Sequence, residues 1–232
     1  MSQPQPLIPM PPSPSPPPPP PKRSRVGIVL GVVGGVVGLL IVAATAWVVV
    51  GADSDSGFPA AEYRLTLPET LLDGGYELTQ DFSDSSGSGL KEEAESRWGA
   101  RDARAAVATY APVNLGGQLN VSGVYGRFTN SDEARATMMK GAANTENLTL
   151  AVPPKDFELA GADTTLTCQV ITMDNGGAEV FAPMCGWNDG NTAAVIGEIT
   201  PGNAADSPED LDLAAVAERT LRIRSELRKP IG

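Results

Sequence analysis

Three patterns of hydrophobic and polar positions follow one another along the chain. Residues 1–25 are rich in proline, which fixes the backbone and removes hydrogen-bond donors, so we expect a disordered tail. Residues 26–50 form an apolar run without a charge, and residues 51–61 are mostly small or polar, as in a linker. Over residues 62–232, short apolar stretches alternate with turn residues, which is typical of a folded domain.

The apolar run at residues 26–50 is predicted to be a transmembrane helix, because a span needs about 20 residues. Three basic residues lie just before this run, and acidic residues follow it. The positive-inside rule then places the N-terminus in the cytoplasm and residues 62–232 outside. We therefore expect a single-pass protein of the cell membrane, with the lipid bilayer as a partner. A cleaved signal peptide is the rival interpretation, although its apolar region is usually shorter.

Glycines in the apolar run have a spacing that permits close helix packing. Gly27, Gly31 and Gly35 recur every four residues, and this spacing lets two helix backbones approach each other. Glycine is also common in membrane helices in general, so the spacing alone is a weak indication. The hypothesis that follows is a homodimer formed through the membrane helix.

The folded part is predicted to mix strands with helices. Runs rich in Val, Ile, Thr and Phe predict strands at residues 103–112, 117–128, 164–173, 178–187 and 191–200. Helices are predicted at residues 88–99, behind an N-cap at Asn130, and behind an N-cap at Ser207. This order favours an α+β fold, with an antiparallel sheet and helices packed mainly on one face.

Cys168 and Cys185 are the only cysteines of the chain, and both lie in the part predicted to be extracytoplasmic. In an oxidising compartment such a pair predicts a disulfide. If Gly176 and Gly177 form the turn between the two cysteine strands, the cysteines face each other directly. An Asn-Gly turn would instead leave them diagonal. A nucleophilic or metal-binding Cys185 would need an imidazole or further ligands, so we expect a structural disulfide.

Groups that carry chemistry are few. The chain contains no histidine, which removes the commonest general base and the commonest zinc ligand. Trp187 and Asp189 follow the second cysteine and are weak candidates for a binding site. Asp189 is also a candidate general acid or base, but Asn-Asp-Gly-Asn is ordinary turn chemistry. We therefore assign no catalytic residue, no metal site and no cofactor.

Charge is distributed unevenly along the chain. All 28 acidic residues follow position 50, where 14 of the 17 basic residues also lie, so this part carries a net charge of −14. Such a surface repels phosphate backbones, which argues against nucleic acid as a partner. It suits a cationic partner, or it keeps an exported domain soluble, and solubility is the simpler explanation.

Three stretches carry a resemblance to a known group of proteins. They are "LNVSGVYGRFTNSDEA", the two cysteine strands with "MCGWNDGNTAAV", and the closing "LRIRSELRKP". Together they resemble uncharacterised actinobacterial envelope proteins with a proline-rich cytoplasmic tail, one membrane helix and a small extracytoplasmic domain. The resemblance covers most of residues 60–230 and implies no activity, cofactor or catalytic residue. Such proteins often carry histidine after the aspartate, where this chain has Gly190.

These observations favour a membrane-anchored extracytoplasmic domain that binds an envelope protein, a peptide or a cell-wall component, without catalysis. One alternative is a carboxylate-dependent hydrolase of envelope polymers that uses Asp189 and a second acid. Another is an envelope sensor that associates with itself through the membrane helix. The binding domain is preferred because the sequence shows no recognisable set of catalytic residues.

Overall fold

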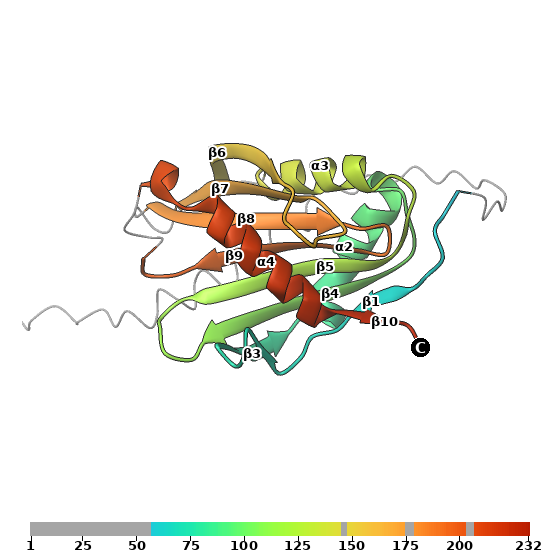
Figure 1. Ribbon diagram of the computed structural model, residues 1–232, viewed down its shortest axis with the longest axis horizontal. Helices are drawn as coiled ribbons and strands as arrows, with labels where there is room; N and C mark the ends of the chain where they lie inside the picture. The colour runs from blue at the N-terminus through green and yellow to red at the C-terminus, as the bar shows by residue number, and fades with distance from the viewer. Residues whose placement is uncertain (1–56, 145–147, 175–178, 203–206) are drawn as a thin grey trace, which may run out of the picture.

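The computed structural model describes residues 57–144, 148–174, 179–202 and 207–232 of the chain. Within them, eight strands form one antiparallel sheet in the order β2-β3-β4-β5-β9-β8-β7-β6 (Figure 1). The strands are β2 (Thr70–Leu71), β3 (Tyr76–Asp81), β4 (Ala100–Pro112), β5 (Gln118–Phe128), β6 (Leu148–Phe157), β7 (Leu166–Asp174), β8 (Glu179–Asn188) and β9 (Thr192–Ile199). Because β9 pairs with both β5 and β8, it joins the two halves of the sheet.

A separate two-stranded ribbon brings the beginning and the end of the described chain together. β1 (Tyr63–Leu65) pairs antiparallel with β10 (Arg228–Pro230), and the two strands lie near the end of β4 and β5 (Figure 1). The Leu65 side chain is buried against the main sheet, where a Cβ on Gly123 would lie 2.6 Å from it. A glycine in β5 therefore makes room for the ribbon.

Helices cover both faces of the sheet. α2 (Ser83–Arg97) and α3 (Ser131–Ala142) lie on one face, and α4 (Leu213–Leu227) crosses the other face diagonally (Figure 1). The fold-class prediction, with helices mainly on one face, is therefore wrong. Its error is visible in β4, where every residue from Ala106 to Tyr110 is buried. Strands without alternation of apolar and polar residues are buried on both faces, and each face then needs a cover.

The transmembrane part of the predicted fold is also corrected. No helix in the described part of the chain is long and apolar enough to cross a membrane. The helices there have at most 15 residues, whereas a span needs about 20. The predicted span at residues 26–50, with Gly27, Gly31 and Gly35, lies outside the described residues, as does the tail at residues 1–25.

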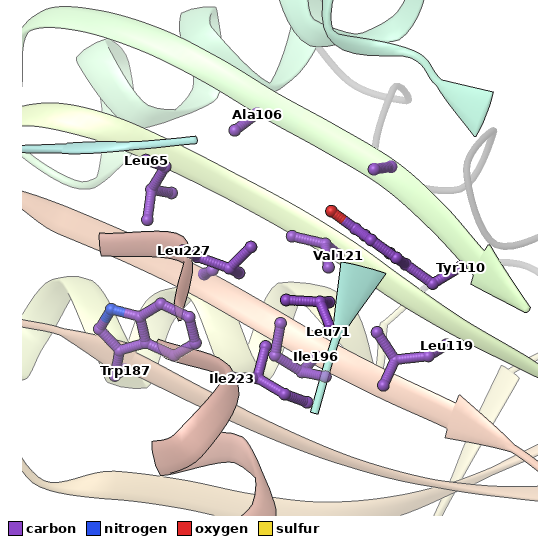
Figure 2. Packing of buried hydrophobic residues seen from close by; sticks show 12 residues of the cluster. Leu65, Leu71, Ala106, Tyr110, Leu119, Val121, Trp187, Ile196, Ile223 and Leu227 are labelled. Carbon is purple, nitrogen blue, oxygen red and sulfur yellow. The ribbon is translucent and has the colours of Figure 1, made fainter. Parts of the chain in front are cut away.

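The face under α4 is packed around large side chains. Ile223 and Leu227 of α4 and Leu65 of β1 belong to one cluster with residues of five other strands (Figure 2). The cluster also contains Leu71, Ala106, Ala108, Tyr110, Leu119, Val121, Trp187, Ala194 and Ile196. Since burying one large apolar side chain stabilises a fold by about 1.5–3 kcal/mol, α4 is tied firmly to the sheet.

The opposite face has its own core. Leu90 of α2 and Met138 of α3 pack with Val107, Val124 and other residues of β4 and β5. On β8, a Cβ at Gly186 would lie 2.7 Å from the Met139 sulfur, so glycine allows α3 to approach the sheet closely. All buried clusters are formed by residues between Leu65 and Leu227, so the described part of the chain contains a complete core.

The disulfide prediction is confirmed. Cys168 of β7 and Cys185 of β8 are bonded to each other, are direct partners in the register, and have Cα atoms 4.1 Å apart. Both are fully buried beneath Val216 and Ala217 of α4. The expected register also holds farther along, where Thr172 pairs with Phe181, while the glycine turn lies outside the described residues.

Two of the three α-helices described, α3 and α4, begin at a side-chain cap. The Asn130 side chain accepts from the Glu133 amide at 3.2 Å, as the sequence predicts. The predicted cap at Ser207 instead begins a 3₁₀ turn, η1 (Pro208–Asp210). α4 starts later because the Asp212 carboxylate accepts from the Ala214 and Ala215 amides and so caps the helix. α2 starts at Ser83, five residues before its predicted start.

Candidate functional site

The turn between β8 and β9 holds the most elaborate polar cluster near the predicted site residues. Asp189 lies in this turn, and its carboxylate is 3% exposed. One oxygen, Oδ1, accepts from the backbone amides of Asn191 and Thr192, at 3.1 and 2.8 Å. The other, Oδ2, accepts from the Thr192 hydroxyl at 2.7 Å. These three hydrogen bonds, all within the turn, orient the Asp189 carboxylate without help from residues elsewhere in the chain.

Two arginines from the C-terminal part of the chain complete the cluster around Asp189. Arg224 of α4 donates to Asp189 Oδ2 from Nη2 at 2.5 Å and from Nε at 3.2 Å. Arg228 Nε lies 2.9 Å from the same oxygen without a hydrogen-bonding direction, so this is a charge contact. Asp163 adds a second carboxylate, 2.7 Å from Arg224 Nη2, and its side chain is 60% exposed. Two acids therefore balance two arginines.

The same turn also holds the β1–β10 ribbon in place. The Asn191 side-chain oxygen accepts from the amides of Glu62 and Tyr63 at 2.9 and 3.2 Å. The Asn191 nitrogen donates to the Ala60 carbonyl at 2.8 Å. The Arg228 guanidinium lies over the Tyr63 ring, 3.2 Å from its centroid. A buried amide and a stacked arginine thus connect the turn to both ends of the described chain.

Trp187 and Asp189, the predicted binding candidates, meet in this turn but not at the surface. The Trp187 side chain is fully buried in the core under α4. Its indole nitrogen donates to the Thr192 hydroxyl at 3.1 Å, and that hydroxyl donates to Asp189. A relay of hydrogen bonds therefore joins the two residues. Its geometry serves to fix the turn, because neither side chain faces solvent.

A second polar cluster lies farther along β9 on the same face. Glu198 has a side chain that is 5% exposed, and it forms an ion pair with Arg219 Nη1 at 3.1 Å. The Tyr76 hydroxyl at the start of β3 donates to the other side of this carboxylate. Arg219 is 34% exposed, so this cluster reaches solvent at the edge of α4, unlike the Asp189 cluster.

The environment of Tyr76 shifts its titration strongly. Burial, the hydrogen bond to Glu198 and the charge of that carboxylate raise the pKa of Tyr76 to about 12, while Arg219 opposes the shift. A phenol with this pKa keeps its proton at neutral pH and acts as a hydrogen-bond donor. The cluster therefore places the Glu198 carboxylate between a neutral hydrogen-bond donor and a cation.

Neither cluster is arranged to hold a metal ion. In residues 57–144, 148–174, 179–202 and 207–232, no three His, Cys, Asp or Glu side chains gather as metal ligands. Each buried carboxylate instead has arginine as its partner, and arginine supplies positive charge where a cation would otherwise bind.

The Glu198 cluster and the burial of Arg224 are the features that sequence reasoning missed. Arginine side chains of a surface helix are usually solvated, yet the Arg224 side chain is 6% exposed. The spacing of residues in the sequence could have indicated this burial. Arg224 follows the buried Thr220 by four residues, which places both on the inner face of α4. Glu198 gave a similar signal, since it continues the alternation of Ala194 and Ile196 on β9.

Comparison with known proteins adds no assignment to this geometry. No protein-family model matches the chain, and no curated protein or solved structure matches it significantly.

Proposed function

We propose that the chain carries an exported, non-catalytic binding domain that acts in the cell envelope. The observation that carries this proposal is the disulfide between Cys168 and Cys185. Disulfides persist in oxidising compartments outside the cytoplasm and are rare inside it. The resemblance to actinobacterial envelope proteins supports the same location.

The environment of Asp189 supports a binding role over hydrolysis. A general acid or base must reach the substrate, directly or through one water molecule. Asp189 is 3% exposed, and both of its oxygens already accept hydrogen bonds. The chain also lacks histidine, the commonest alternative base. We therefore assign Asp189 a structural role and do not propose the hydrolase alternative.

Export is tested with a reporter that is active only outside the cytoplasm, fused after Gly232 of the full chain. We expect activity, and we expect both cysteines to resist a thiol reagent that is added after denaturation without reductant. A matched fusion that lacks residues 1–56 should show no reporter activity, and its cysteines should be labelled under the same conditions. Activity of a cytoplasmic reporter at the same position would contradict the proposal.

The binding role is tested by chemical cross-linking of the full chain in intact envelopes, with an excess of untagged chain as competitor. We expect discrete cross-linked species that the competitor removes. A substrate screen of envelope polymers provides the opposite test. Turnover that Asp189→Asn abolishes, while the disulfide and the fold remain, would show that the domain is an enzyme.

A further inference from the structure

The ends of the described chain meet at a positively charged region of an otherwise acidic domain. We call this region the basic end and define it as Arg64, Arg101, Arg104, Arg127 and Lys229. Arg64 and Lys229 are partners in the β1–β10 register, and Arg104 and Arg127 belong to neighbouring strands of the main sheet. β1 packs on β5 beside these positions, and the β1–β10 ribbon lies near one end of the sheet on the side that α4 crosses (Figure 1).

The basic end contrasts with the rest of the domain. From residue 57 onward the chain has 14 basic and 26 acidic residues, which is a net charge of −12. Among the described residues, the basic end gathers five basic residues beside two acidic ones, Glu62 and Asp102. At about 0.1 M salt the Debye length is about 10 Å, so a surface that meets the basic end experiences mainly the local positive charge.

Three of these basic side chains are presented to solvent. Arg64, Arg104 and Lys229 are exposed, and the described residues place no carboxylate within ion-pair distance of them. Arg101 and Arg127 are more constrained, since both lie against the Phe58 ring, and Arg127 also pairs with Asp102 at 2.6 Å. The exposed three are therefore the residues available to a partner.

The arrangement of Arg64 and Lys229 is unfavourable for the isolated domain. The two residues lie directly opposite each other on the outer side of the ribbon. Like charges in this position destabilise a strand pair. Departures from such local rules are expected at functional sites, where another interaction compensates for them. An anionic partner would supply that compensation.

We propose that the basic end docks on an anionic phospholipid surface. Ile231 follows the charged pair, and its side chain is 44% exposed at the tip of the ribbon. Basic residues beside an exposed aliphatic side chain are the combination that binds membrane interfaces, through headgroup charge and shallow apolar contact. The inference rests on the proposed export, because an exported domain meets lipid headgroups and not nucleic acid.

The test uses residues 57–232, which contain the complete core and the disulfide, and vesicles of phosphatidylcholine with or without phosphatidylglycerol. We expect binding only to vesicles with phosphatidylglycerol, weakening as salt increases. The variant R64Q/R104Q/K229Q should lose affinity, by roughly fivefold per cation and about a hundredfold in total. All three residues are exposed, so circular dichroism should show an unchanged fold.

The matched control is K91Q/R97Q/K140Q, which removes three exposed cations from α2 and α3 on the other face. It changes the net charge equally and should keep its vesicle affinity within about twofold, since screening confines the interaction to the docking face. Equal losses in the two variants would overturn the proposal. So would binding to neutral vesicles, or tighter binding to soluble polyglutamate than to vesicles, which would identify an acidic protein as the partner.

This outcome is separable from that of the proposed function. An active external reporter with no vesicle binding would remove the lipid partner and leave the exported binding domain in place. Vesicle binding with a reporter confined to the cytoplasm would remove export and leave the lipid-docking surface in place.

Discussion

Two buried carboxylates on the α4 face, Asp189 and Glu198, are both paired with arginines of α4, yet their surroundings differ. Asp189 accepts from two backbone amides, one hydroxyl and Arg224, and the side chains of this pair are 3% and 6% exposed. Glu198 contacts a phenol and Arg219, and that arginine is 34% exposed. One acid is enclosed by its own turn, and the other lies at the margin of the helix.

The difference shows how the same pair of charges serves two purposes. A fully buried ion pair is strongly destabilising to break, because the remaining charge has no access to water. A pair whose cation reaches solvent can rehydrate when its partner is removed. Asp189 therefore holds the ribbon and α4 together. Glu198 instead raises the pKa of Tyr76 and pairs with a partly exposed arginine at the edge of α4. The five experiments that follow can break or sharpen this contrast.

The largest effect is expected for Asp189→Asn. The substitution keeps the shape but leaves Arg224 buried without its main counter-charge, so the free energy of unfolding should fall by about 3–5 kcal/mol. Urea unfolding followed by circular dichroism measures this. Glu218→Gln, an exposed position on the same helix, is the control and should change stability by less than about 0.5 kcal/mol. A similar small change for Asp189→Asn would show that the enclosure is not stabilising.

Removal of the disulfide should have the next largest effect. Cys168→Ser and Cys185→Ser should each lower the free energy of unfolding by about 2–4 kcal/mol, and the double variant by little more, because one bond is lost in every case. The bridge holds β8, which leads into the Asp189 turn. Hydrogen exchange should therefore accelerate at Asn191 more than at Glu198. Equal acceleration at both amides would indicate general loosening instead.

A smaller loss is expected for Glu198→Gln. Arg219 can turn to water, so the free energy of unfolding should fall by only about 1–3 kcal/mol, the value typical of one unsatisfied buried group. The same unfolding experiment checks this, with Asp189→Asn as the internal standard. If Glu198→Gln proved as damaging as Asp189→Asn, exposure of the arginine would not explain the difference between the two sites.

The smallest effect is the dependence of stability on alkaline pH. Tyr76 holds its proton more tightly in the folded state, with a pKa of about 12 against 10.0 in the unfolded chain. The contribution of Tyr76 to the free energy of unfolding is complete below pH 10 and is lost as pH rises toward 12. Near pH 11 this loss amounts to about 1 kcal/mol. Tyr76→Phe should flatten this decline by that amount in alkaline unfolding curves.

The absorbance of phenolate at alkaline pH gives an independent check on Tyr76. Glu198→Gln removes both a hydrogen-bond acceptor and a negative charge, so it should lower the pKa of Tyr76. Burial also raises the pKa of Tyr110, whose hydroxyl donates to the Pro68 carbonyl, and this shift should be unaffected. A Tyr76 titration that ignores the substitution would show that the carboxylate does not control the phenol.

Local patterns predicted those parts of the fold that depend on neighbouring residues. The register that joins Cys168 to Cys185 followed from alternation and a tight turn, and the Asn130 cap followed from its side chain. β6 was missed because Pro153 and Pro154 interrupt it, and a strand with two prolines is tolerated at a sheet edge, which sequence cannot identify. The cover on both faces was missed for the same reason: it depends on which distant elements meet.

The candidate site was predictable only in part. Asp189 could be recognised as a turn residue from Asn-Asp-Gly-Asn. The structure adds that this turn binds the β1–β10 ribbon and two arginines. Its partners Arg224 and Arg228 come from 35 and 39 positions farther along the chain. No local pattern encodes such a pairing, because it forms only when α4 is laid across the sheet. In the folded domain Arg224 and Arg228 contact the Asp189 carboxylate instead of water, and Arg228 also lies over the Tyr63 ring.

The pairing of β1 with β10 has a mechanical consequence. A pull on the chain ahead of β1 acts first on the Tyr63–Pro230 end of the ribbon, which opens one residue pair at a time. The first hydrogen bond to bear the load is the one from the Asn191 side-chain nitrogen to the Ala60 carbonyl, followed by those from the Glu62 and Tyr63 amides to Asn191. Tension therefore passes directly into the turn that encloses Asp189, and through Arg228 into the end of α4. The bonds of that turn therefore stand, together with the β1–β10 pairing, between a pull on the chain ahead of β1 and the core.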